Sequence, residues 1–198
     1  MGSIGIRWST GNRMTHGIAG YRIMTRWYPP EDLAYHEVQQ FRQIWVILLV
    51  GFLAALAWYT FAIQIISGEP FGTNPASDSV VLIILAIFGI AFPFWFWLMK
   101  LEIQVATMTL RFRMYPLHLS WKEVPFADIA SVMAVVYKPI REYGGWGIRF
   151  GRKGMAYNVS GDRGVQVTLK SGKSFLLGSL RAEELELVLR SKIHPGTR

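Results

Sequence analysis

The sequence predicts an α-helical membrane hairpin of two transmembrane segments, followed by a small β-rich barrel or sandwich that ends in a helix. Three observations support this fold class. Two stretches of about twenty residues are apolar and uncharged. Apolar and polar residues alternate from Leu101 onward, which is typical of strands. The last segment, Leu180 to Ile193, has its apolar residues on one helical face.

The composition sets limits on the chemistry. The chain has 198 residues, of which 52% are hydrophobic, and a formal net charge of +8. It contains no cysteine, which excludes disulfides and thiolate metal sites. A basic surface beside a bilayer favours anionic lipid as a partner, and we predict no nucleic acid.

The two apolar stretches run from Ile44 to Ile66 and from Val80 to Met99. At about 1.5 Å per residue each can cross a hydrocarbon core of about 30 Å. Trp45, Trp95 and Trp97 lie near the span ends, as in an aromatic belt. Neither span has an ionisable group at depth, which argues against a transporter or a channel built from this chain alone.

Charge asymmetry predicts the topology. Residues 1–43 carry a net charge of +2, residues 67–79 carry −2 and residues 100–198 carry +8. Basic flanks remain in the cytoplasm, and Arg42 and Lys100 stand at the two inner ends. We therefore expect a multi-pass protein of the cell (inner) membrane with both termini in the cytoplasm.

The spacing also predicts the segments around the spans. Residues 1–30 are expected to be a flexible N-terminal tail. Leu33, Val38 and Phe41 recur at roughly helical spacing, which predicts an interfacial helix over 31–43. Residues 31–99 would thus hold this helix and the transmembrane hairpin, and residues 100–194 one cytoplasmic domain.

In that domain the phase of alternation changes between Ala106 and Thr109, which predicts a turn there. The expected strands are 101–105, 110–114, 117–124 and 129–138. A hairpin turns at Ser171-Gly172, and Ser179 is positioned to cap the last helix.

Two motifs stand out: YKPIREYGGWGIR at 137–149 and AYNVSG at 156–161. With EVQQFRQ before the first span and the final hairpin and helix, they resemble a family of uncharacterised prokaryotic two-span membrane proteins with a bacterial PH-like domain. The resemblance covers roughly residues 30–190. It implies a PH-like fold and the two-span topology, and it implies no agreed activity.

The glycine-rich motif allows three interpretations. Its glycines can form a structural bend whose tryptophan fills the barrel, which we favour. They can form a backbone nest that binds an anion beside two arginines, or the segment can contact a protein. The candidate ligand or partner residues are Arg141, Tyr143, Gly144, Gly145, Trp146, Gly147, Arg149, Tyr157, Asn158 and Arg163.

No P-loop, GxSxG or HExxH motif is present, and the four histidines lack metal-binding spacing. We predict no catalytic residues, no metal and no cofactor. The leading hypothesis is a non-enzymatic, membrane-anchored module that scaffolds a complex with a membrane protein partner or as a homo-oligomer. One alternative is a sensor of anionic lipid headgroups. Another is a membrane-associated enzyme with its site formed by Tyr143, Trp146, Arg149 and Tyr157.

Overall fold

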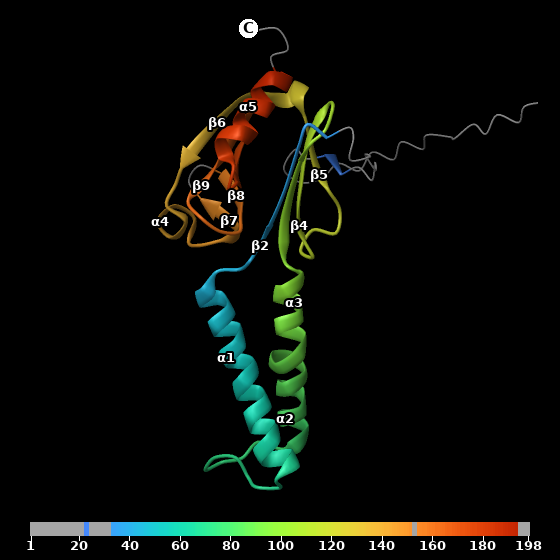
Figure 1. Ribbon diagram of the computed structural model, residues 1–198, viewed down its shortest axis with the longest axis vertical. Coiled ribbons are helices and arrows are strands. Elements are labelled where there is room, and N and C mark those ends of the chain that lie inside the picture. The colour runs from blue at the N-terminus through green and yellow to red at the C-terminus, as the bar shows by residue number, and fades with distance from the viewer. Residues whose placement is uncertain (1–21, 24–32, 152–153, 194–198) are drawn as a thin grey trace, which may run out of the picture.

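The computed structural model describes residues 22–23, 33–151 and 154–193. Two long helices run side by side at one end of the molecule, and two β-sheets with a helix beside them form the other end (Figure 1). The connection 67–77 lies at the far end of the helices from the sheets.

Each predicted span is one continuous helical stretch. The first consists of α1 (Ile44–Phe61) and the π-helical η2 (Ala62–Ile66). The second consists of α2 (Asp78–Ile84), the π-helical η3 (Leu85–Ala91) and α3 (Phe92–Leu98). Both stretches are long and apolar enough to span a membrane.

A side-chain hydrogen bond joins the two helices at the carbonyl of Gly89, in the π-helical stretch η3. The indole N–H of Trp58 donates to this carbonyl at 3.3 Å. A Cβ on Gly89 would lie 2.8 Å from Leu85 Cδ1 and 3.3 Å from Trp58 Nε1, so those two side chains would have to shift to admit it.

The first sheet has the strand order β1-β5-β4-β3-β2, and all its neighbours are antiparallel. Its strands are β1 (Arg22–Ile23), β2 (Tyr35–Gln40), β3 (Lys100–Val105), β4 (Thr109–Tyr115) and β5 (Lys122–Pro125). The predicted strands over 101–105 and 110–114 are confirmed, with the turn where the phase changes. Of the strand expected over 117–124, only its last residues are extended.

The second sheet has the order β6-β9-β10-β8-β7. Its strands are β6 (Ile129–Val136), β7 (Gly147–Gly151), β8 (Gly154–Asn158), β9 (Arg163–Leu169) and β10 (Ser174–Gly178). The predicted β9–β10 hairpin is confirmed, whereas β10 and β8 are parallel. Two short helices, η4 (Phe126–Asp128) and α4 (Pro139–Tyr143), lie in the connections on either side of β6.

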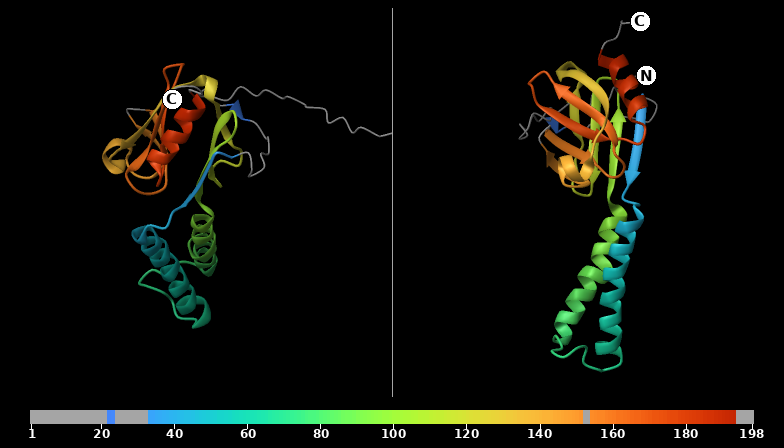
Figure 2. Two further views of the ribbon diagram at one scale, coloured as in Figure 1. Left: turned by 45° about the horizontal axis from the view of Figure 1, so that its top comes forward. Right: turned by 90° about the vertical axis from the view of Figure 1, so that its left-hand side faces the viewer.

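The core lies between the two sheets and is completed by α5 (Ala182–Ile193). Helix α5 lies beside β2 in the right-hand view of Figure 2. Ala182, Leu185 and Leu189 are its buried face, and Val188 and Ile193 pack against the core, as the apolar spacing predicts. Ser179 Oγ accepts the N–H of Arg181 at 3.1 Å, just before the helix begins.

The interfacial helix predicted over 31–43 is wrong, because Tyr35–Gln40 is strand β2. It pairs along its whole length with β3, from Tyr35 opposite Val105 to Gln40 opposite Lys100. The inward side chains of β2 are Tyr35, Glu37 and Gln39. Two of them are polar, so apolar and polar residues do not alternate along this strand. The remaining apolar residues of the segment happen to recur at a spacing that is typical of a helix.

This strand also changes the domain boundary. The β-domain does not begin at residue 100, because β2 belongs to it and precedes α1. The two long helices are therefore an insertion between two paired strands of one sheet. The tail predicted over 1–30 contains strand β1 at Arg22–Ile23, and its other residues lie outside the described part of the chain. Within the described ranges the two sheets are separate and do not close into one barrel.

Candidate functional site

In the glycine-rich segment, the backbone N–H groups that could bind an anion already donate hydrogen bonds within the chain. Gly144, Gly145 and Gly147 all have positive φ, as their sequence pattern predicts. The N–H of Gly144 donates to Ile140 O at 2.9 Å, and that of Gly145 to Pro139 O at 3.0 Å. The N–H of Gly147 donates to Asn158 Oδ1 at 2.9 Å. The geometry therefore favours the structural bend over an anion-binding nest made of these three groups.

Asn158 and Trp146 hold the bend in place. The buried Asn158 also donates its Nδ2 to the Tyr137 hydroxyl at 2.9 Å. Burial raises the pKa of Tyr137 to about 12, so that hydroxyl remains protonated. The indole N–H of Trp146 donates to Gly161 O at 3.0 Å, and its ring lies 6.1 Å from that of Trp45. Trp146 thus touches the start of α1 instead of filling the core between the sheets.

The remaining sequence-derived candidates do not converge. Tyr143 is buried with Tyr137, Ala156 and Leu176, whereas Tyr157 lies in the core between the sheets. Since Ala156 and Tyr157 are neighbours on β8, these two clusters lie on opposite faces of the sheet. Arg149 Nε donates to Trp146 O at 2.9 Å, so these two residues are neighbours. The geometry gives no support to a catalytic site that needs Tyr143 and Tyr157 together.

The two other arginines of the candidate set lie apart. Arg141 is exposed on α4. Arg163 is exposed and forms an ion pair with Glu183 at 3.2 Å. The ten candidate residues therefore comprise one connected bend around Gly147 and Asn158 and several separate positions.

Sequence reasoning missed a half-buried polar group at the edge of the core. Lys122 Nζ donates to the Tyr157 hydroxyl at 2.7 Å, and the ring of His118 lies 5.9 Å from that of Tyr157. Burial lowers the pKa of Lys122. Burial, followed by the nearby Lys122 charge, lowers the pKa of His118 to about 4. His118 is therefore neutral near pH 7.

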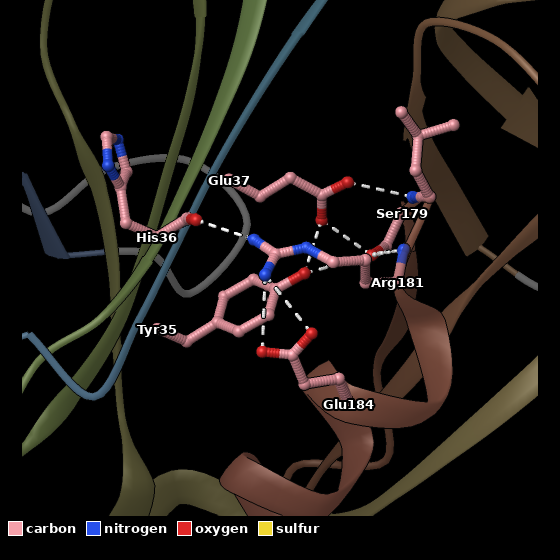
Figure 3. Close-up of polar contacts among 7 residues, drawn as sticks. Tyr35, His36, Glu37, Ser179, Arg181 and Glu184 are labelled. Carbon is pink, nitrogen blue, oxygen red and sulfur yellow. Dashed lines mark hydrogen bonds and ion pairs between the residues drawn. The ribbon is translucent and has the colours of Figure 1, made fainter.

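A second polar group, also missed, joins β2 to the start of α5 (Figure 3). Glu37 is 6% exposed. Its Oε2 accepts the hydroxyls of Tyr35 and Ser179, both at 2.6 Å, and its Oε1 accepts the N–H of Leu180 at 2.8 Å. Burial and the Glu37 hydrogen bond raise the pKa of Tyr35, which keeps its hydroxyl a donor. The carboxylate is therefore fully engaged in fixing the edge strand.

Arg181 packs on the outer side of this polar group and links β2 to α5. Its Nη2 donates to His36 O at 2.8 Å, and its Nη1 contacts Glu184 at 3.1 Å. Its guanidinium lies 4.7 Å from the centre of the Tyr35 ring. Figure 3 shows the guanidinium between the strand and the helix.

Next to this group, a groove of about 500 Å³ opens where β2 leads into α1. The residues that line it are Val38, Gln39, Gln40, Arg42, Gln43, Ser160 and Leu180. Gln39 Nε2 donates to Gly178 O at 2.8 Å, and Gln43 Nε2 donates to Val159 O at 2.7 Å. Both Oε1 atoms are buried without a hydrogen-bond partner among the described residues.

Among the residues that the structure describes, no three His, Asp or Glu side chains are grouped to hold a metal ion. The groove at the base of β2 is the candidate site that we consider further, because two of its lining residues carry buried amide oxygens without a partner among the described residues. No single signal in the sequence marked it, because the glutamines belong to a segment whose pattern suggested a helix.

The fold and the groove define a class of protein: a two-sheet β-domain that carries two long apolar helices inserted between paired strands. A family described as one of unknown function, DUF6141, matches residues 26–194, and the chain belongs to this family. This agrees with the uncharacterised family that the sequence motifs indicated. No curated protein matches the chain.

Proposed function

We propose that the chain is a membrane-anchored module whose two helices cross the cell (inner) membrane, with both termini in the cytoplasm. Most apolar side chains of the helices are solvent-exposed, among them Ile44 at 75%, Phe52 at 65% and Trp97 at 73%. An apolar surface of this extent needs a covering, and a bilayer supplies one. The charge distribution given above supports the orientation.

The β-domain is a PH-like module in this proposal. Two sheets enclose one core, and a C-terminal helix lies against it, as the resemblance implies. The module acts without catalysis as a scaffold for a membrane protein complex. The observation that carries this proposal is that the helices are inserted between β2 and β3, so the domain is held by two chain connections at the membrane face.

The anchoring is tested by single-cysteine labelling, because the chain contains no cysteine. Asn74→Cys lies in the connection 67–77, and Ser171→Cys lies in the β9–β10 turn. In intact cells a membrane-impermeant maleimide should label Asn74→Cys, and should label Ser171→Cys only after permeabilisation. Equal labelling of both variants before permeabilisation would refute the topology.

The scaffold role is tested by photo-crosslinking at an exposed edge. Phe150 on the edge strand β7 is 80% exposed, and Ile140 on the adjacent α4 is 70% exposed. A photoreactive residue at Phe150 should give one crosslinked product in native membranes, and the same residue at Lys170 is the matched control. Phe150→Ser should reduce a complex isolated in mild detergent. A monomer as the only species in both experiments would contradict the scaffold role.

A further inference from the structure

We propose that the groove between β2 and the start of α1 binds the headgroup of a polyol phosphodiester lipid, of which phosphatidylglycerol is the simplest example. This inference rests on the proposed membrane anchoring, because it takes the ligand from the bilayer. The groove includes Arg42 and Gln43, which directly precede the first residue of α1, Ile44. It therefore lies at the level where headgroups surround an inserted helix.

The first support is the pair of unpartnered amide oxygens. Each glutamine donates its Nε2 to a backbone carbonyl, at 2.8 Å for Gln39 and 2.7 Å for Gln43. A flipped amide would place oxygen against oxygen, so these bonds fix which end is the acceptor. Gln39 is only 3% exposed, and a buried acceptor without a donor is costly. Two acceptors without donors thus belong to residues that line the groove, and we infer that the donors of a ligand satisfy them.

The second support is charge. Of the groove-lining residues, Arg42 alone carries a charge, and the others are neutral. A phosphodiester monoanion matches the single guanidinium. Neutral hydroxyl groups match the two amide oxygens better than an ammonium does, because a partly buried ammonium needs an anionic partner. One negative charge combined with hydroxyl donors is the chemistry of a glycerol or inositol phosphodiester.

Both oxygens are inaccessible to solvent in this structure, so a ligand reaches them only if the side chains around the groove move to admit it. Binding should then order the base of the domain. We expect backbone amides of residues 38–43 to exchange more slowly with deuterium when the lipid is bound, because the ligand holds both glutamine side chains.

The experiment uses the full chain in phosphatidylcholine nanodiscs that contain a small, equal fraction of one test lipid. The test lipids are phosphatidylglycerol, phosphatidic acid, phosphatidylethanolamine and phosphatidylcholine itself. Phosphatidic acid has the anion without the polyol, and phosphatidylethanolamine has donors without net charge. Native mass spectrometry counts the retained lipid. We expect retention of phosphatidylglycerol to exceed that of each other lipid by about tenfold.

Variants locate the site. Arg42→Gln and Gln43→Met should each reduce the phosphatidylglycerol preference to less than about threefold. Lys170→Gln, an exposed charge in the β9–β10 turn, should leave it unchanged. Arg141→Gln tests the glycine-rich segment, and a loss there with none at Arg42 would overturn the proposal. Thermal unfolding of each variant shows whether it is still folded. Arg42 is exposed, so Arg42→Gln should fold normally, and it still tests the site if Gln43→Met does not fold.

Further measurements distinguish a membrane lipid from a free headgroup compound as the ligand. They also distinguish a failure of the membrane anchoring from a failure of the lipid binding. Free glycerophosphoglycerol should slow exchange at residues 38–43 only at far higher concentration than the lipid, and stronger binding of the free compound would overturn the lipid assignment. A chain that does not enter nanodiscs overturns the anchoring and this inference together. A chain that enters them and retains all four lipids equally overturns the inference alone, and leaves ordered water as the partner of the two glutamines.

Discussion

The Glu37 carboxylate is expected to be the polar group on which the position of strand β2 most depends. Glu37→Gln changes one oxygen to an NH2 group and keeps the size of the side chain. The carboxylate now accepts from Tyr35 and Ser179 through Oε2 and from Leu180 through Oε1. A carboxamide has only one oxygen, so in either orientation its NH2 group replaces one acceptor.

The magnitude follows from what is lost in each orientation. If the amide oxygen of the glutamine accepts the two hydroxyls, its NH2 group faces the N–H of Leu180. Two donors then face each other, and the Leu180 N–H loses its acceptor. With the opposite orientation, the two hydroxyls lose a charged acceptor. Buried hydrogen bonds to a charged group contribute about 1.5–3 kcal/mol each, so we expect a loss of about 2 kcal/mol in the free energy of unfolding. For a chain of this size that is about 4–8 °C in Tm.

The assay is thermal unfolding of the full chain in mild detergent, followed by circular dichroism. His36→Gln is the matched control, because His36 lies on the same strand with its side chain exposed, and Arg181 contacts only its backbone oxygen. It should change Tm by less than about 2 °C. A Glu37→Gln chain that unfolds at the same temperature as the His36→Gln chain would refute the assignment.

Three further changes have defined outcomes. The pKa of His118 is about 4 in the folded chain against an ordinary value of 6.5, so between these values the unfolded chain binds more protons. The free energy of unfolding should therefore fall as pH decreases from about 6.5 towards 4, and His118→Gln should flatten that slope in a pH series of denaturant titrations. Gly161→Ala should cost about 1 kcal/mol, because φ is +71° but no atom lies within 4 Å of the added Cβ. Gly164→Ala should cost more, because its Cβ would lie 2.5 Å from Leu177 O, and equal urea midpoints for the two alanine variants would contradict this reasoning.

The sequence was sufficient to predict the helices and strands in which the apolar residues follow one clear pattern. Twenty uncharged apolar residues allow few structures, and the alternation in β3, β4, β9 and β10 places one apolar face toward the core. The face of α5 is defined in the same way by Leu185 and Leu189. These predictions needed only local information, because each segment has one side that must be buried.

Strand β2 was not predictable by this reasoning, because its inward positions include Glu37 and Gln39. Their burial is stabilised by partners more than a hundred residues away, at Ser179 and Gly178, which no local pattern reveals. The glycine-rich bend had a similar difficulty. Its positive φ values were predictable from composition, whereas the use of the Gly147 N–H depends on Asn158, which lies on the neighbouring strand β8.

The insertion of the helices between β2 and β3 has a mechanical consequence. The last paired residues, Gln40 and Lys100, stand a few positions from the ends of α1 and α3. The spacing of these helix ends is therefore coupled to a hydrogen-bonded ladder whose strands lie about 4.8 Å apart. Any change in the spacing of these helix ends must therefore be accommodated by the pairing of β2 with β3, in which Glu37 lies opposite Ile103 and Gln39 opposite Leu101.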